Sequence, residues 1–314
     1  MVRYRASKAK RVLRALWDTP IVCCLHELLG RPLTYLGLPG PDLEDLREWK
    51  PWLGQCTAVE IEEKYDVPRA MAENRVRYGL NETGLQILRG DIDDVALTGH
   101  DLDGRGLALE KYDVVFPDYC GGWLYKDHVT GRSKRYSAFK ALLERQRNGA
   151  DKAPEDANTF LLLLGVNVRS DDEGEVQNYV KHSLPLSLSL KHADAIRRLS
   201  RKGNEHWFLK YYVANNIAQA ASAVSFASYI YPPVYYRSSR QTAMMRFAAF
   251  LSLVPRSDAP QPQTQNVNRL PLAALVNNEV VQLAAPKPLT RFVDRLQPLP
   301  IYIKQAKSAA TKLS

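Results

Sequence analysis

The chain has 314 residues, 25% of them charged, and a formal net charge of +9. This length can bury a large core and hold one large domain, or one domain with extensions. No apolar stretch reaches the roughly 18 residues of a membrane span. The four cysteines form no CxxC pair, which argues against a disulfide framework or a zinc site and favours a reducing cytoplasm.

The positive charge is concentrated at the two ends of the chain. Residues 1–30 carry six basic and two acidic residues, residues 286–314 carry six basic and one acidic residue, and residues 31–285 are neutral overall. Basic ends of this kind attract phosphate backbones or an acidic partner protein. The alternative is that both ends are solvated and only aid solubility. The basic start has no apolar segment with a small-residue cleavage site, so no secretory signal is expected.

The first elements in chain order are an amphipathic helix followed by short apolar strands. Residues 8–29 predict a helix, with a break near Pro20 because proline disrupts helix interiors. Short apolar runs, each followed by Gly, Asp or Glu, are typical of buried parallel strands. The predicted strands are 33–37, 57–60, a weaker one at 85–91, 112–118 and 160–166.

The remaining pattern predicts helices between the strands and a late hairpin. Helices are expected over 41–49, 66–78, 135–147 and 191–221, with a polar turn at 101–105 and an irregular loop or short strand at 183–189. Residues 233–237 and 242–254 predict an antiparallel hairpin, although the second segment also suits a helix. We therefore divide the chain into a basic helical segment at 1–30, an α/β domain at 31–254, a Pro- and Gln-rich linker at 255–268 and a basic extension at 269–314.

Polar residues follow the predicted strands in the order that a nucleoside site requires. Gly37, Glu60, Asp91 and Asp118 each stand at or just after a strand end. In a doubly wound sheet the carboxyl ends of the strands meet at one edge, where ligands bind. We expect these four residues to lie together at that edge.

These features resemble the class I S-adenosylmethionine-dependent methyltransferases over residues 31–254. The resemblance implies an α/β fold with a doubly wound, mostly parallel sheet (Rossmann-like methyltransferase fold), a terminal antiparallel hairpin and, here, a C-terminal extension. It also implies S-adenosylmethionine as cofactor, with Gly37 and Gly40 in the loop after the first strand. The acid Glu60 would bind the ribose hydroxyls, and Asp91 would lie near the adenine.

The Asp118-Tyr119 turn resembles, in part, the Asp-Pro-Pro-Tyr turn of amino-methylating members of the family. Asp118 is then a general base or an acceptor for an amine, and Tyr119 or Trp123 is a surface on which a base stacks. Methyl transfer itself needs mainly in-line positioning of the acceptor. The alternative is that Asp118 caps the following turn and Trp123 packs in a core.

A basic segment after this turn favours nucleic acid as the substrate, with DNA or RNA left open. Its proposed substrate-binding residues are Lys126, Arg132, Lys134 and Arg135. The histidines show no metal-ligand spacing, so we expect no metal. Two other functions remain open: a catalytically inactive methyltransferase-like subunit, favoured by the prolines around Gly40, and an NAD-dependent oxidoreductase, which lacks its glycine fingerprint. The C-terminal extension is a candidate site for a protein partner, and no membrane association is expected.

Overall fold

We describe the fold from a computed structural model. The structure describes residues 8–61, 66–80, 84–119, 121–123, 134–150, 159–167, 205–231, 233–237, 243–253 and 281–282. No helix within these ranges is long and apolar enough to cross a membrane. The predicted loop at 183–189, the first part of the helix at 191–221, the linker at 255–268 and nearly all of the extension lie outside them.

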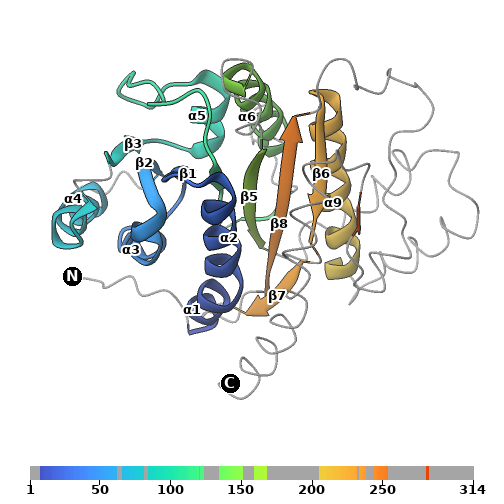
Figure 1. The fold of residues 1–314 in the computed structure, drawn as a ribbon, viewed down its shortest axis with the longest axis horizontal. Helices are drawn as coiled ribbons and strands as arrows, with labels where there is room; N and C mark the ends of the chain where they lie inside the picture. The colour runs from blue at the N-terminus through green and yellow to red at the C-terminus, as the bar shows by residue number, and fades with distance from the viewer. Residues whose placement is uncertain are drawn as a thin grey trace, which may run out of the picture.

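The centre of the molecule is a nine-stranded sheet (Figure 1). Its order is β3-β2-β1-β4-β5-β8-β6-β9, and β7 pairs with β8 off this path. The strands from β3 to β5 are parallel, whereas β8 is antiparallel to both β5 and β6. The strand bounds are β1 Leu33–Gly37, β2 Leu53–Glu60, β3 Gln86–Arg89, β4 Val114–Phe116, β5 Thr159–Asn167, β6 Phe226–Ile230, β7 Val234–Arg237, β8 Ala243–Leu253 and β9 Val281–Gln282.

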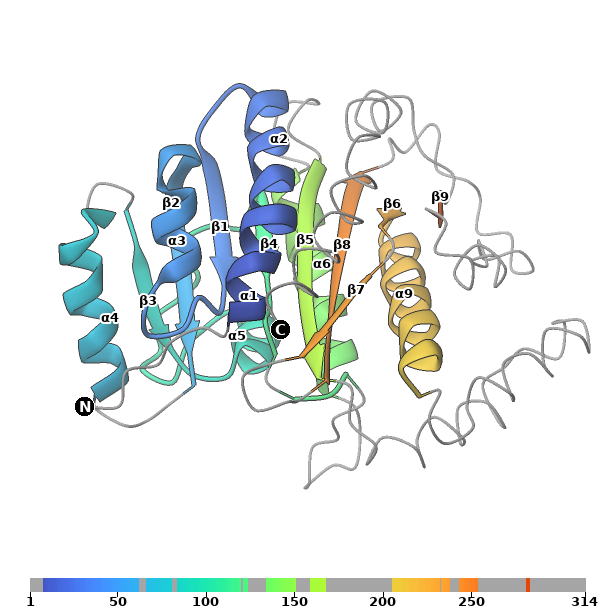
Figure 2. The same ribbon diagram turned by 90° about the horizontal axis from the view of Figure 1, so that it is seen from below.

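Helices cover both faces of this sheet, as a doubly wound fold requires (Figure 2). One face carries α1 Lys8–Leu13, a π-helical turn η1 Arg14–Asp18, α2 Thr19–Leu29, α3 Glu44–Trp49 and α4 Asp66–Arg77, with a 3₁₀ turn η2 Lys50–Trp52 after α3. The other face carries α5 Ile92–Thr98, α6 Lys134–Ala150 and α9 Glu205–Ala223. We call these the α2 face and the α6 face of the sheet.

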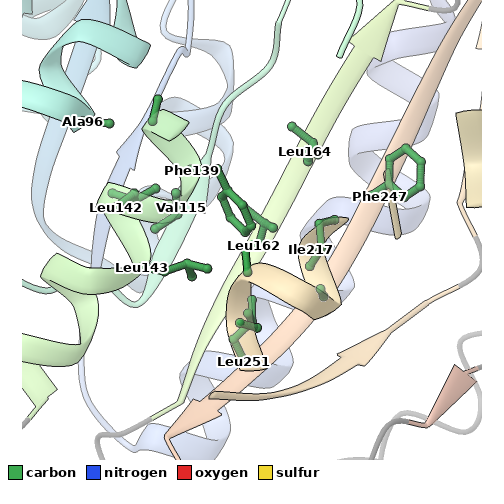
Figure 3. Packing of buried hydrophobic residues seen from close by; sticks show 14 of the residues in the cluster. Ala96, Val115, Phe139, Leu142, Leu143, Leu162, Leu164, Ile217, Phe247 and Leu251 are labelled. Carbon is green, nitrogen blue, oxygen red and sulfur yellow. The ribbon is translucent and has the colours of Figure 1, made fainter. Parts of the chain in front are cut away.

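Each face has its own hydrophobic core. On the α6 face, leucines and phenylalanines of β5 and β8 pack against α6 and α9, as Figure 3 shows for Leu162, Phe247, Phe139 and Ile217. On the α2 face, Trp17 and Trp49 are fully buried against the sheet. Because β5 is buried along its whole length, its residues are apolar on both sides, which explains the uninterrupted leucine run in the sequence.

The predicted strands and the late hairpin are confirmed, with shifted bounds. β2 begins at Leu53, earlier than predicted, and β7 pairs antiparallel with β8, which is a strand and not a helix. The strand β6 was missed. It lies within a continuous apolar stretch directly after α9, where a turn with a positive φ at Ser225 (65°) provides no sequence signal of the Gly or Pro kind.

The predicted helices 66–78 and 135–147 agree with α4 and α6 within three residues at each end, whereas α5 was not predicted and α3 starts later than predicted. α3 begins at Glu44 and not at Pro41, because Leu43 adopts a left-handed conformation with φ 48°. The expected break at Pro20 is a π-helical turn, η1, and the backbone remains helical at both of its ends. Proline cannot donate the normal helical hydrogen bond, so a wider turn before it is physically reasonable.

Candidate functional site

The carboxyl ends of four neighbouring strands meet at one edge of the sheet. Gly37 of β1 lies opposite Phe116 of β4, so Asp118 follows β4 at the same edge. Glu60 at the end of β2 lies opposite Arg89 of β3, and Asp91 follows β3. The structure thus places the ends of β3, β2, β1 and β4 where the sequence predicted that a ligand site would form.

The start of the loop after β1 lies close to β4 and to Tyr35. Leu38 N donates to Phe116 O at 3.1 Å. A Cβ at Gly37 would lie 2.6 Å from the same carbonyl and still closer to the Tyr35 hydroxyl. Gly40 has φ 69°, which explains why glycine is required there. Tyr35 is fully buried, so its side chain uses space beside Gly37 that a glycine loop would otherwise leave open.

The two acids at the ends of β2 and β3 are accessible in part. Glu60 is half-buried, and its carbonyl accepts a hydrogen bond from Gly90 N at 2.9 Å. Asp91 caps α5, because its side chain accepts a hydrogen bond from Asp93 N at 2.9 Å. The exposed fraction of the Asp91 side chain is 31%, which leaves part of the carboxylate able to contact a ligand.

Tyr119 lies in a buried polar group on the α6 face. Its hydroxyl donates to Asp93 Oδ1 at 2.5 Å, and the Arg135 guanidinium stacks on its ring, 4.1 Å from the centroid. Burial raises the pKa of Asp93 to about 6, against the opposing effect of the Tyr119 hydrogen bond. Trp123 is 1% exposed and packs edge-to-face on Phe139. The prediction that Tyr119 or Trp123 offers a stacking surface is therefore wrong for this conformation, because packing against α6 turns both rings inward.

The basic side chains after the turn are also engaged internally. Arg135 is 8% exposed, so it does not form the phosphate-binding surface that the sequence predicted. Lys134 Nζ lies 2.6 Å from Asp94 Oδ1 and 3.7 Å from Asp91 Oδ2, which ties the start of α6 to α5. Lys126 and Arg132 lie outside the described residues.

Asp118 lies on the α2 face, in a buried group of charges that the sequence did not predict. Its Oδ2 pairs with Lys10 Nζ, and its Oδ1 lies 3.5 Å from Arg246 Nη2. The same guanidinium lies 3.8 Å from Asp18 Oδ2. We call Lys10, Asp18, Asp118 and Arg246 the ionic cluster. A Cβ at Gly165 would collide with Asp118 Oδ1, so glycine at this position of β5 makes room for the carboxylate.

The charges around Asp118 determine what its carboxylate can do. Burial alone would raise its pKa, but the attraction of Lys10 and Arg246 outweighs burial and lowers the pKa below its usual value. A carboxylate with a lowered pKa is a weak proton acceptor and a strong partner for a cation. Of the two roles predicted for Asp118, the structure disfavours the general base and is compatible with the amine-binding role.

Asp18 has the opposite behaviour although it shares Arg246 as a partner. Burial raises its pKa to about 7, and Arg246 only partly offsets this effect. The two carboxylates of the ionic cluster therefore have different pKa values. The pKa of Asp118 is lowered, so it is ionised, and the pKa of Asp18 is raised to about 7.

Several buried polar atoms in and around the ionic cluster have no hydrogen-bond partner among the described residues. They are Asp18 Oδ1, Asp118 Oδ1, Arg246 Nε and Nη1, Trp17 Nε1, Tyr35 Oη and Tyr236 Oη. Buried polar groups normally find partners, because an unmade hydrogen bond costs about 1–3 kcal/mol. The cluster therefore has hydrogen-bonding capacity that water or a polar ligand can use.

Arg246 was the clearest signal that sequence reasoning missed. It is the one charged residue of β8, in a strand whose neighbours Met245 and Phe247 are buried on the opposite face. A single arginine inside an apolar strand indicates a buried partner, since an unpaired buried charge is very costly. Arg14, on the helical N-terminal segment, pairs with Glu44 at 2.8 Å and also with Asp45. Two of the basic residues of segment 1–30 thus neutralise acids inside the protein.

A small apolar cavity of about 20 Å³ lies on the α6 face, between the sheet and α5 and α6. Its lining includes Leu36, Ile92, Tyr119, Trp123 and Phe139. This volume is about that of one water molecule, which is far too small for a nucleoside. Within the described ranges, no group of three His, Cys, Asp or Glu residues is arranged to hold a metal ion.

Comparisons with known proteins give structural matches only. No family model and no curated protein matches the chain. Solved structures that match include magnesium protoporphyrin IX methyltransferase from Synechocystis, with bound SAH (TM-score 0.37, 12% identity, 79% of this chain and 89% of that chain). A putative O-methyltransferase from Klebsiella pneumoniae matches with TM-score 0.39 and 11% identity over 78% of this chain and 90% of that one. Spermidine synthase from Thermotoga maritima matches with TM-score 0.38 and 11% identity over 91% of this chain and 74% of that one.

The TM-scores and sequence identities of these matches are too low to assign an activity, so we assign the fold from the strand order of the sheet. A parallel set β3-β2-β1-β4-β5 is completed by a late antiparallel strand, β8, between β5 and β6. The chain has a Rossmann-like methyltransferase fold. Helices on both faces and the hairpin formed by β7 and β8 complete the agreement with the predicted fold class.

Proposed function

We propose that the chain is an S-adenosylmethionine-dependent methyltransferase. The observation that carries the proposal is the register of the sheet, which aligns the ends of β1, β2, β3 and β4 at one edge. Glu60 and Asp91 are part-exposed acids on neighbouring strand ends. Acids in these places suit the hydroxyl groups of a ribose and the polar edge of an adenine.

The fit of the residues to the cofactor differs between its two ends. At the nucleoside end, Glu60 is half-buried and the Asp91 side chain is 31% exposed. At the loop after β1, the Tyr35 hydroxyl lies against Gly37. A ligand therefore has less space beside the Gly37 backbone than the glycine in the sequence suggested. The cofactor supplies the methyl group, and the chain's own residues bind it, orient the acceptor and exclude water.

Asp118 is our candidate for holding the acceptor. Its lowered pKa keeps it ionised, and Arg246 and Gly165 hold it at the carboxyl edge beside β5. In this role Asp118 would hold a hydrogen-bond-donating acceptor, such as an amine, in line with the methyl group. A nitrogen that binds as an ammonium would first release a proton to solvent, because only its free lone pair can attack.

The nucleic acid acceptor that the sequence suggested remains a hypothesis. It now depends on Lys126, Arg132 and the chain ends, because Arg14, Lys134 and Arg135 are paired within the protein. Adding the purified enzyme and methyl-labelled cofactor to duplex DNA, single-stranded DNA or RNA, and measuring the label retained on each, tests this directly.

Calorimetric titration with S-adenosylmethionine tests the proposed cofactor site. We expect Glu60→Gln and Asp91→Asn to weaken binding about ten-fold or more, because a hydrogen bond to a charged group is worth about 1.5–3 kcal/mol. Asn is also a good helix cap, so Asp91→Asn should leave α5 intact. Glu73→Gln, an equal charge change on the exposed surface of α4, should bind as the wild type does.

The tight contact of Gly37 with the Tyr35 hydroxyl and the Phe116 carbonyl favours a second candidate, a methyltransferase-like subunit that has lost its cofactor. The same titration separates the two. If the folded wild-type protein takes up no S-adenosylmethionine or S-adenosylhomocysteine, the enzyme proposal fails and the non-catalytic subunit is favoured.

A further inference from the structure

We propose that Lys10 holds the place of a cationic acceptor group at Asp118, so that the N-terminal helix closes the acceptor site until a ligand ammonium displaces it. The inference rests on the proposed methyl-transfer function, and it adds the chemical class of the acceptor and a means of controlling access to it. The two oxygens of the Asp118 carboxylate have different partners, Arg246 at Oδ1 and Lys10 at Oδ2.

One side of Asp118 is fixed to the sheet. Arg246, on β8, is 2% exposed and lies 3.5 Å from Oδ1, while its guanidinium also rests on the ring of Phe116, 4.3 Å from the centroid. Gly165 of β5 leaves room for the carboxylate, since a Cβ there would lie 3.1 Å from Cγ and closer still to Oδ1. Both groups on this side belong to β5 and β8, which pair along their length in the sheet.

The other side of Asp118 is occupied by Lys10, on the short helix α1 beside β7 (Figure 1). The exposed fraction of the Lys10 side chain is 22%, against 2% for Arg246, so Lys10 is the partner that solvent and ligands can reach. If Lys10 leaves, Asp118 keeps Arg246 as a partner, which it shares with Asp18, so a second cation is needed beside it. Displacement by another ammonium therefore exchanges one ion pair for an equivalent one and does not leave a buried charge unpaired.

The backbone between α1 and α2 provides a place for the movement. The π-helical turn Arg14–Asp18 separates the two helices, and turns of this kind are rare and occur often at functional sites. Arg14, in this turn, is anchored to Glu44 and Asp45 of α3. Leu13, at the end of α1, is 4% exposed in the core of the α2 face, so the movement required is that of the Lys10 side chain and the first residues of α1, while Leu13 and α2 stay packed on the sheet.

Polar atoms without partners show that the closed arrangement leaves hydrogen-bonding capacity unused. Arg246 Nε and Nη1 and Tyr236 Oη can donate, and Asp118 Oδ1 can accept. Tyr236 is 8% exposed, and its electrostatic interaction with Lys10 raises the pKa of that lysine. An amine that also carries a hydroxyl or carbonyl oxygen matches both the carboxylate and these donors. The acceptor class that we infer is a primary or secondary amine with a neighbouring oxygen. It binds as the ammonium and releases a proton to solvent before its nitrogen lone pair attacks the methyl group.

The test compares Lys10→Met with Arg11→Met. Methionine keeps the volume of the lysine stem and removes its charge, so no empty cavity is created. Arg11 is exposed one residue further along α1, so its variant loses the same charge without contacting Asp118. The probe is n-butylamine, which reproduces the lysine side chain, and n-butanol is its uncharged counterpart. Binding is measured by calorimetry, alongside S-adenosylmethionine binding to the same samples.

We expect Lys10→Met to bind n-butylamine about ten-fold more tightly than the wild type and Arg11→Met do. This factor corresponds to a site that Lys10 occupies in about nine-tenths of the wild-type molecules, because only the remaining tenth can bind the amine. Amide hydrogen exchange over residues 8–13 should be faster in Lys10→Met, with residues 14–18, β4 and β5 unchanged. Adding Asp118→Asn to Lys10→Met should abolish amine binding, and the exchange data show whether that double variant is folded.

Two results would overturn the inference: equal n-butylamine affinity in Lys10→Met and Arg11→Met, or n-butanol binding as tightly as n-butylamine. The n-butanol comparison holds even if the Asp118→Asn variant does not fold. If S-adenosylmethionine binds while the amine affinities are equal, only this inference fails. If the amine binds as expected and S-adenosylmethionine does not, the amine site stands and the methyltransferase proposal fails.

Discussion

Replacing Arg246 with methionine tests whether the ionic cluster is as dry as its burial indicates. Arg246 is 2% exposed and lies between Asp18 and Asp118, so its removal leaves two buried carboxylates with one cation fewer. Breaking a buried ion pair from one side costs about 3–5 kcal/mol, because the remaining charge is uncompensated. We expect a loss of this size in the free energy of unfolding at pH 8.

The pH dependence of this loss identifies its cause. In the wild type, Asp18 has a pKa of about 7, so it is ionised at pH 8 and protonated at pH 5.5. Without Arg246 its pKa should rise above 8, and the folded state then loses the benefit of ionising Asp18. That benefit is about 1.4 kcal/mol at one pH unit above the pKa. The cost of Arg246→Met should therefore be about 1.4 kcal/mol greater at pH 8 than at pH 5.5.

Urea unfolding at both pH values measures these quantities. Arg69→Met is the matched control, because Arg69 forms an exposed ion pair with Glu73 on α4 and should cost less than about 1 kcal/mol. A cost below about 1 kcal/mol for Arg246→Met, or one that is equal at the two pH values, would show that water reaches the cluster and would refute the reasoning.

Three further predictions concern the same two faces of the sheet. Gly165→Ala should destabilise the fold by about 1–3 kcal/mol in thermal unfolding, because the added methyl group collides with Asp118 Oδ1; an unchanged melting temperature would mean that the carboxylate can swing away. Asp18 has a folded pKa above its unfolded value, so its contribution to stability is complete below about pH 4 and is lost as the pH rises to about 7, with a slope of up to about 1.4 kcal/mol per pH unit. Asp18→Asn should flatten this dependence, and a slope equal to that of the wild type would assign it to another group. Tyr119→Phe should lower the free energy of unfolding by about 1–3 kcal/mol. It should also raise the pKa of Asp93 above about 6, because the Tyr119 hydrogen bond lowers that pKa in the wild type. NMR titration of the Asp93 carboxyl measures this change, and an unchanged pKa would contradict the contact.

The sheet could be predicted because its signals are local. Buried parallel strands produce short apolar runs, and β1, β3, β4 and β5 were each found from such a run. The strand β6 could not be found in this way. Its residues continue an apolar stretch that starts in α9, and only the turn at Ser225 separates the two elements.

The site could be predicted at the level of the backbone and not of the side chains. The strand ends carrying Gly37, Glu60 and Asp118 follow from the order of the strands. The partners of Asp118 are Lys10 and Arg246, which lie more than 100 residues before and after it in the sequence, and no local pattern pairs residues so far apart. The inward direction of the Tyr119 and Trp123 rings is likewise a result of packing against α6.

The central place of β8 determines when the fold can be completed. This strand is the last long strand of the described sheet, yet it pairs with β5 along nine residue pairs and with β6 on its other side. During synthesis the edge of β5 therefore has no neighbour until residue 253 has left the ribosome, and β6 has no place to attach before then. Such long-range pairing folds slowly and exposes a strand edge to other chains. Chains that end before β8 should aggregate. Arg246 lies on β8, so the last charge of the ionic cluster is added when β8 pairs with β5.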